Sequence, residues 1–451
     1  MRVRRTSAVA LSLAVLGGFA VIALSAPPGA LPTTTSKMSD KAVNRAYKIV
    51  DVKGRKIGTA NWRVTRAGGN CCEALVMATR TGRLVEFGGT YPIYSDDEGK
   101  TWHEINPTVP STSRVPNPGP RKIAGGEGTL VQSPDGDILG VGWDPYSGDR
   151  LQSFMYHAKD KKWYYQEAPL HEPFYDREWV AVAKGPFTIN GTKVPWVSMV
   201  VSNFNRRIVL MSTDGLNYFQ PTQRQVDAVA NAPVSKFLPT TPDPDLDYMQ
   251  EHAQTNLSAL ATGILSFDSV NGCKVQTLTN NGSWACFSLP NEQELTGPLH
   301  TDSRGWIHEV VASKGETEFT YRVSRNGGRT WTQTIVPIPG ELAMETYDFK
   351  VHGKLGLGVI ATHAKRDDGA FQDVVIKLDI KGSKPKVQRM YYVGDGNLKS
   401  TVGLDVLGTV QGAKSNRVDF TSVAVLPNGT IAVSFADKRY DDPAIAILPA
   451  R

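Results

Sequence analysis

Short runs of apolar residues alternate with polar turns along most of the chain. Pairs of such runs flank turns that contain Gly, which is typical of β-hairpins. After residue 45 no long segment shows the 3.6-residue apolar period of an amphipathic helix, and only 223–232 is compatible with a short helix. The pattern therefore predicts an all-β protein. The expected hairpins span residues 76–87, 129–142, 300–311 and 421–435.

One eight-residue pattern, Ser-x-Asp/Asn-x-Gly-x-Thr-Trp, occurs at 95–102 and again at 324–331, with a shortened copy at 212–219. Its acid or amide can accept hydrogen bonds from the backbone of a tight turn, and its Gly supplies a positive φ. The Trp then packs under the turn. We therefore expect a structural role for Ser95, Asp97, Gly99, Trp102, Ser212, Asp214, Ser324, Asn326, Gly328 and Trp331.

On these residues the chain resembles the Asp-box (bacterial neuraminidase repeat) family. The resemblance implies a β-propeller of four-stranded blades, in which each box turns an outer hairpin at the rim. The spacing of the copies corresponds to about 57 residues per blade. We expect seven blades, whereas six would require one unit to be a long insertion. The expected blades begin near residues 71, 127, 177, 252, 298, 345 and 417.

The two ends of the chain complete this picture. The last expected blade has room for only three strands, and a strand at 47–52 is expected to complete it and close the ring. Residues 1–26 combine arginines with a long apolar run, as in a secretory signal or an uncleaved signal anchor. Residues 27–44 read as a Pro/Thr/Ser-rich linker, and 45–451 as one propeller domain. The expected location is secreted or in the cell envelope.

The charge and the cysteine content of the chain limit which binding partners, metals and cofactors are expected. The formal net charge is +6, of which the signal contributes three arginines, and no basic stripe appears, so nucleic acid is not expected as a partner. Cys273 and Cys286 flank an expected hairpin and favour a cross-strand disulfide. The adjacent Cys71 and Cys72 can form a vicinal disulfide or remain two thiols. Because no CxxC spacing occurs, we expect no structural zinc and no cofactor. The membrane is expected as a partner only through an uncleaved anchor, and the oligomeric state stays open.

Propellers bind ligands over the central channel, where the inner strands begin. Polar residues at the expected blade starts are therefore the candidates for a site. Arginine forks match carboxylates, and a carboxylate beside a Tyr or another carboxylate suits glycosidic chemistry. A carboxylate there can also simply bond the backbone of the next blade. The candidates are Glu73, Glu178 and Tyr347 for catalysis, and Arg177, His252, His300, Asp348 and Arg417 for substrate binding.

The best-known members of the Asp-box family are exo-sialidases, with an arginine triad, a Tyr/Glu nucleophilic pair and an Asp acid/base. By resemblance Tyr347 is the counterpart of the nucleophile, with Glu345 on the same strand face. The first-blade motif of an aromatic followed by Arg-Ile-Pro is absent, and 71–75 reads Cys-Cys-Glu-Ala-Leu. Three hypotheses remain. They are a hydrolase or lyase acting on a carbohydrate ligand, a non-catalytic propeller that binds glycan or protein, and a metal- or redox-linked protein built around His252, His300 or the Cys pair.

Overall fold

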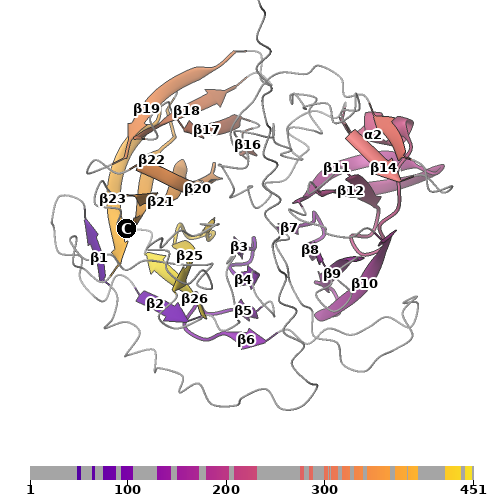
Figure 1. Cartoon of the computed structure of the whole chain (residues 1–451), viewed down its shortest axis with the longest axis horizontal. Coiled ribbons are helices and arrows are strands. Elements are labelled where there is room, and N and C mark those ends of the chain that lie inside the picture. The colour runs from indigo at the N-terminus through magenta and orange to yellow at the C-terminus, as the bar shows by residue number, and fades with distance from the viewer. Residues whose placement is uncertain are drawn as a thin grey trace, which may run out of the picture. The chain divides into compact units, whose positions relative to one another are not determined.

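β-Strands gathered into six sheets of four or five strands make up nearly all of the secondary structure in the described part of this computed structural model (Figure 1). The all-β class is thereby confirmed. Helix α2 (Gln223–Ala230) confirms the short helix expected at 223–232. The structure describes residues 48–51, 63–66, 75–87, 93–104, 129–143, 150–171, 179–202, 208–230, 275–278, 284–287, 299–302, 304, 306–312, 317–325, 330–338, 343–365, 371–382, 384–394, 422–437 and 442–448.

Three sheets consist of four antiparallel strands in chain order, and each is named here by its first strand. In all of them the first strand forms one edge. The β3 sheet contains β3 (Leu75–Ala78), β4 (Leu84–Phe87), β5 (Ile93–Ser95) and β6 (His103–Glu104). The β7 sheet contains β7 (Thr129–Gln132), β8 (Ile138–Trp143), β9 (Arg150–His157) and β10 (Lys162–His171). The β16 sheet contains β16 (Leu299–Thr301), β17 (Ile307–Ala312), β18 (Glu318–Ser324) and β19 (Thr332–Pro337).

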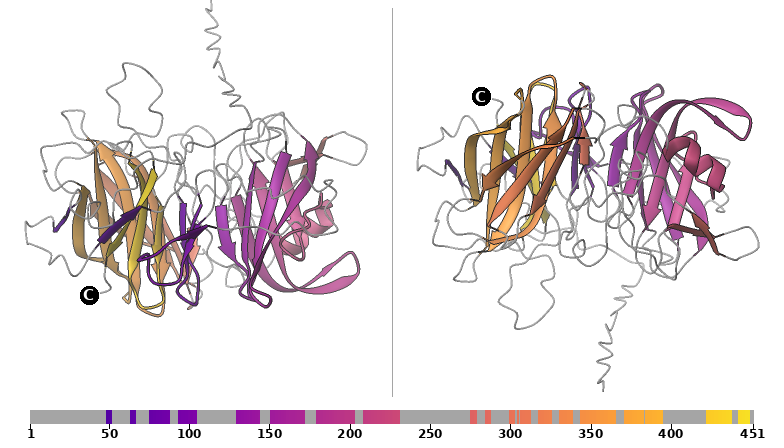
Figure 2. Two further views of the ribbon diagram at one scale, coloured as in Figure 1. Left: turned by 90° about the horizontal axis from the view of Figure 1, so that it is seen from below. Right: turned by 90° about the horizontal axis from the view of Figure 1, so that it is seen from above.

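The other three sheets gain a strand or a hairpin from elsewhere in the chain. The β11 sheet contains β11 (Trp179–Ile189), β12 (Thr192–Ser202) and β13 (Ile208–Ser212), followed by the hairpin β14 (Val275–Leu278) and β15 (Trp284–Phe287). Figure 2 shows α2 beside this sheet, where it contacts β11. The β20 sheet contains β20 (Ala343–His352), β21 (Leu357–Lys365), β22 (Phe371–Asp379), β23 (Lys386–Gly394) and β1 (Lys48–Asp51). The β24 sheet contains β24 (Ser422–Val425), β25 (Ile431–Asp437), β26 (Asp442–Leu448) and β2 (Arg63–Arg66).

The two N-terminal strands correct one expectation. The strand predicted at 47–52 exists as β1, but it pairs with β23 and extends the β20 sheet. The strand that completes the β24 sheet is β2, which pairs antiparallel with β26. Both segments are only four residues long, with two apolar residues in β1 and one in β2, so neither carries enough apolar pattern to specify its partner edge.

Four sheets open with the same five-residue hairpin turn, which confirms the hairpins expected from the sequence. The fourth residue is Gly in each sequence, and Gly82, Gly136 and Gly429 have φ values of 93°, 98° and 88°. A side chain at these positions would be strained, which explains the repeated Gly. The N–H groups of Thr79, Ser133, Asp302 and Leu426 donate to the carbonyls of Arg83, Asp137, Trp306 and Thr430 at 2.8–3.0 Å.

Neighbouring sheets contact one another through their first strands. The contacts join β11 to β7, β7 to β3, β3 to β24, β24 to β20, and β20 to β16. Buried apolar side chains of adjoining sheets form shared clusters, such as Val76 and Leu84 with Ala432 and Ile447. Six of the seven expected blade starts lie within five residues of a first strand, and the one near 252 falls outside the described residues.

Candidate functional site

The Ser-Asp pairs of two sequence boxes make their described polar contacts within their own turns. The Asp97 carboxylate accepts the N–H groups of Lys100 and Thr101 at 2.9 and 2.8 Å. Asp214 accepts the N–H groups of Leu216 and Asn217 at 2.9 and 2.7 Å. Burial opposes a low pKa at Asp97, but the bonds from Thr101, Ser95 and Lys100 outweigh it and hold the pKa at about 2. Gly99 and Gly215 have a φ of 77°. Ser212 accepts the Gly215 N–H, and Trp102 packs against an apolar cluster, as expected for box residues. In the third box, Ser324 and Trp331 belong to the described residues, whereas Asn326 and Gly328 lie outside them.

Box turns and first-strand turns lie on one side of adjoining sheets. In the box turn at 95–101, Glu98 accepts a hydrogen bond from Asn428 in the β24–β25 turn at 2.9 Å. Arg80, in the β3–β4 turn, donates to the Pro134 carbonyl of the β7–β8 turn at 3.1 Å. A Cβ added at Gly353, in the β20–β21 turn, would lie 2.7 Å from Asp302 of the β16–β17 turn. Since these turns follow the carboxyl ends of the first strands, the amino ends of those strands gather on the opposite side.

Most of the predicted site residues immediately precede first strands along the chain. Arg177 and Glu178 stand directly before β11, Glu73 two positions before β3, and Arg417 five positions before β24. These four and His252 lie outside the described residues, as do Cys71, Cys72 and Cys273. The β14–β15 hairpin expected between Cys273 and Cys286 is present, with Gln276 opposite Cys286. The predicted disulfide itself stays a prediction.

Tyr347 does not occupy a position that suits a nucleophile. Its side chain is 0% exposed, and its hydroxyl donates to the Val310 carbonyl of the neighbouring β16 sheet at 2.6 Å. Its ring packs edge-on against Phe319, with centroids 4.9 Å apart. A register shift between Met344 and Thr346 also breaks the i, i+2 relation assumed for Glu345. Tyr347 therefore stabilises the contact between two sheets.

Asp348 joins three sheets through their first strands. It is 1% exposed, and its carboxylate accepts the Val423 N–H of β24 at 2.7 Å. Ser422, beside Val423, in turn accepts the Val76 N–H of β3 at 3.1 Å. Burial raises the pKa of Asp348 to about 7, against the opposing effects of Lys350, the N–H groups of Val423 and Phe349, and the Ser422 hydroxyl. Burial lowers the pKa of Lys350 to about 8. The residue predicted to bind substrate thus bonds the next sheet, which is the structural alternative for a carboxylate on a first strand.

His300 is buried between the β16 and β20 sheets. It is 1% exposed and packs edge-on against Phe349 at 5.5 Å between centroids. Among the described groups, none reaches either ring nitrogen with hydrogen-bond geometry, although the Phe349 backbone lies close. Burial, with Lys350 and His308 nearby, lowers the pKa of His300 well below its ordinary value. His300 is therefore a neutral imidazole enclosed between two sheets, and its described contact is the packing against Phe349.

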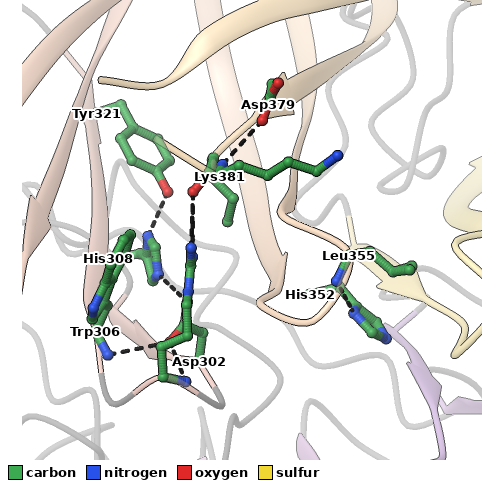
Figure 3. A network of polar contacts seen from close by, with 10 residues as sticks. Asp302, Trp306, His308, Tyr321, His352, Leu355, Asp379 and Lys381 are labelled. Atoms are coloured by element: carbon green, nitrogen blue, oxygen red, sulfur yellow. Dashed lines mark hydrogen bonds and ion pairs between the residues drawn. The ribbon is translucent and has the colours of Figure 1, made fainter. Parts of the chain in front are cut away.

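A polar network in the β16 sheet, which the sequence did not predict, joins a histidine, a tyrosine, an aspartate and an arginine (Figure 3). His308 lies between the Tyr321 hydroxyl at 2.6 Å from Nδ1 and the Asp302 carboxylate at 3.1 Å from Nε2. Asp302 also accepts the Arg304 Nε–H at 2.6 Å, and Arg304 stacks on Trp306 at 3.7 Å. Burial opposes a low pKa at Asp302, but the bonds from His308 and Arg304 bring it to about 2. Because His308 is 0% exposed and both ring nitrogens are engaged, this network stabilises the hairpin.

Two buried glutamates were also not predicted. Glu309 on β17 is 0% exposed and accepts a bond from Arg322 at 3.2 Å. Glu86 on β4 is 1% exposed, and none of the described groups bonds its Oε1. Burial raises the pKa of Glu86 well above its ordinary value. The available sequence signal was a single Glu inside each of the apolar strands Leu-Val-Glu-Phe and Ile-His-Glu-Val-Val-Ala.

The described part of the chain contains neither a group of side chains that could hold a metal ion nor a helix that could span a membrane. No group of three or more His, Cys, Asp or Glu side chains there is arranged to hold a metal ion. In the same residues no helix combines the length and the apolar character needed to span a bilayer.

Comparisons with known proteins give only distant structural likenesses. No protein-family model matches the sequence, and no curated protein is significantly similar to it. A protein of unknown function from Dyadobacter fermentans is 12% identical over 88% of this chain and 99% of its own, with a TM-score of 0.37. An ulvan lyase solved with a bound saccharide is 11% identical over 86% of this chain and 96% of its own, with a TM-score of 0.40. The NanB sialidase of Streptococcus pneumoniae is 13% identical over 85% of this chain and 69% of its own, with a TM-score of 0.25. Likenesses of this size do not assign a family.

Proposed function

We propose that this protein is an exported, sialidase-like β-propeller of seven blades that acts on glycans, as a hydrolase or a lyase, at the amino ends of its first strands. The observation that carries the proposal is that the first strands of neighbouring sheets contact one another, with their turns and the boxes on one side and their amino ends on the other. The first strands that follow these segments contact one another from sheet to sheet, although they are far apart in the sequence.

The order of the sheets supports the proposed seven-blade ring. Six sheets adjoin through their first strands in a single series that runs from β11 to β16. Between the ends of this series, residues 231–298 provide enough chain for one more unit, although their described part, the β14–β15 hairpin, pairs with β13 of the β11 sheet. The pairing of β2 with β26 then closes the β24 blade with a strand from the other end of the chain.

The residues that precede the first strands supply the chemistry of the proposed site. Arg177 and Arg417 offer planar guanidinium groups that match a sugar carboxylate in two parallel hydrogen bonds. Glu73 and Glu178 supply carboxylates for acid and base roles at a glycosidic bond, and His252 a further polar contact. An anionic sugar is the substrate class that this set favours. The N-terminal signal would bring the protein to the glycans of the cell envelope or its surroundings.

A non-catalytic glycan-binding propeller is the second candidate. It is favoured by the placement of Tyr347 and Asp348, which serve contacts between sheets instead of forming a reactive pair. Under this alternative the same end of the first strands binds sugar without cleaving it.

One assay separates the two candidates. The purified protein is incubated with a panel of anionic and neutral polysaccharides, and both binding and new chain ends are measured. We expect cleavage of an anionic polysaccharide, lost by at least tenfold in Arg177→Ala and Glu178→Gln. The control is Lys193→Ala, at an exposed position near the β11–β12 turn, which should leave activity unchanged. Saturable binding without cleavage would select the second candidate, and neither binding nor cleavage would overturn the proposal.

A further inference from the structure

Glu86 and Glu309 occupy the same place in two sheets. The β3–β4 hairpin is closed by the pair Ala78–Leu84, and Glu86 follows opposite Val76. The β16–β17 hairpin is closed by the pair Thr301–Ile307, and Glu309 follows opposite Leu299. Because the backbone hydrogen bonds across the two turns follow the same pattern, residues at equal distances from the turn in the two sheets are structurally equivalent.

The fold does not require a carboxyl group at this place. In the hairpins closed by Gln132–Ile138 and Val425–Ile431, which have the same turn, the corresponding residues are Gly140 and Val433. A Cβ at Gly140 would lie 2.0 Å from the Phe154 ring, so a ring fills that space. Val433 is 1% exposed and fills it with an aliphatic side chain. An apolar group therefore serves packing here, and a buried acid must be explained in another way.

The two glutamates differ in their surroundings. The Oε1 atoms of both are buried and bonded by none of the described groups, but Glu309 has the guanidinium of Arg322 3.2 Å from its Oε2. A buried carboxyl group without a cation or a donor is stable only when it is protonated. The burial of Glu86 raises its pKa accordingly.

The direction of the Glu86 side chain follows from strand alternation. Leu84, Val76 and Ile93 belong to the apolar cluster shared with the β24 sheet, and Glu86 is two residues from Leu84 and opposite Val76 and Ile93. It therefore points between the β3 and β24 sheets. In the backbone register, Glu104 of β6 pairs with Ile93, and Arg63 of β2 pairs with Ile447.

Glu86 also lies toward the proposed glycan site. It is the last residue but one of β4, at the end remote from the β3–β4 turn and level with the beginning of β3. The bond between Ser422 and the Val76 N–H joins the β24 and β3 strands at the same level. Glu73, a predicted site residue, precedes β3 by two residues in the sequence.

We infer that Glu86 is an uncharged carboxylic acid that donates a hydrogen bond to an anionic sugar bound at the amino ends of the first strands. The inference rests on the proposed function and adds a specificity-determining residue to it. An ionised glutamate would repel an anionic ligand, whereas a neutral acid can donate to one of its oxygens.

The test measures binding of tetragalacturonate, an unsulfated uronic acid oligosaccharide, to the full protein by calorimetry between pH 5 and 9. Glu86→Val, which reproduces the side chain of Val433, should weaken binding at least tenfold at pH 6. Glu86→Gln keeps a donor without a charge, so it should bind as the wild type does at pH 6. It should also lack the loss of affinity that the wild type shows when Glu86 ionises as the pH rises. Glu309→Gln is the matched control and should leave both affinity and its pH dependence unchanged.

The outcomes separate the inference from the proposed function. If the wild type binds tetragalacturonate and Glu86→Val binds it within twofold of the wild type, the inference is overturned and the proposed function stands. If the wild type binds no glycan, the proposed function fails, and a ligand contact by Glu86 fails with it. Infrared spectroscopy of the free protein at pH 6 tests the charge state separately. A protonated carboxyl band lost in Glu86→Gln and kept in Glu309→Gln is expected, and its absence from the wild type would overturn the inference.

Discussion

The β3 and β16 sheets are built on the same hairpin, yet they carry different interiors. The β16 sheet contains a connected set of polar groups, in which Asp302 bonds His308 and Arg304 while Glu309 bonds Arg322. At the places of His308 and Asp302 the β3 sheet has Val85 and Thr79. In its described part Glu86 is a buried acid with no cation beside it, and no described group bonds its Oε1. The same hairpin backbone therefore forms with or without these polar side chains. A hydrogen-bonded network that includes cations serves stability, and an acid that the hairpin does not need indicates a function.

Removing the centre of the β16 network should have the largest effect. Asp302→Ala deletes the acceptor for His308, for the Arg304 side chain and for two backbone N–H groups, and leaves Arg304 without its carboxylate. We expect a loss of about 3–5 kcal/mol in the free energy of unfolding, measured by urea denaturation.

The matched control is Thr79→Ala, at the same place in the β3 sheet. There the side chain accepts only the Arg83 N–H and contacts Thr81, so about 1 kcal/mol should be lost. Equal losses in the two variants would contradict the comparison, because they would mean that the turn bond alone explains the effect of Asp302.

The next largest effect is expected at Asp348, the buried carboxyl group that bonds the β24 sheet, and it concerns how the free energy of unfolding depends on pH. The pKa of Asp348 is raised from 3.8 to about 7, so the folded state retains a proton that the unfolded chain releases. The stability contributed by Asp348 is thus fully present below pH 4 and is lost as the pH rises to about 7. Across this range wild-type stability should fall by about 2–4 kcal/mol relative to Asp348→Asn.

Thermal unfolding of both proteins at pH 5 and pH 7.5 measures that difference. Asn keeps an oxygen acceptor for the Val423 N–H, so the variant should fold. Parallel pH profiles of the two proteins would show that Asp348 is already ionised at pH 5, held by Lys350 and the backbone N–H groups.

The two glutamates should respond in opposite directions to an apolar substitution. Glu86→Val removes a buried acid whose Oε1 is bonded by none of the described groups, and should raise the free energy of unfolding by about 1–3 kcal/mol. Glu309→Val removes the partner of Arg322, which is 34% exposed and can be solvated instead, so a loss of about 1 kcal/mol is expected. A destabilised Glu86→Val protein would mean that the carboxyl group serves the fold.

The smallest effect is expected at the boxes. Asp97→Ala deletes the acceptor for two backbone N–H groups in an exposed turn and should cost about 1 kcal/mol at pH 7. Since the pKa of Asp97 is lowered from 3.8 to about 2, its contribution is present above pH 4 and disappears as the pH falls to 2. The difference between the melting temperatures of the two proteins should therefore shrink at pH 2.5. A constant difference would contradict a role for the charged form.

Local features were predictable from the sequence, and contacts between sheets were not. Asp135-Gly136 and Asn428-Gly429 predict their hairpins because a positive φ selects Gly at one position of the turn. The partner of β1 was mistaken, since its edge is chosen by strands 340 residues away or more. The roles of Tyr347 and Asp348 depend on Val310 and Val423, which belong to other sheets. No pattern within one strand reveals such partners. Glu86 had a visible signal, an acid within an apolar strand, but its significance emerges only from comparison with Gly140 and Val433.

The most direct test of the central claim is the position of a bound oligosaccharide in a crystal structure of the protein with the glycan that it binds most tightly. We predict that the sugar lies at the amino ends of the first strands, with its anionic group within hydrogen-bond distance of Arg177 or Arg417. A sugar bound on the side of the box turns, or on the outer strands far from both arginines, would contradict the account.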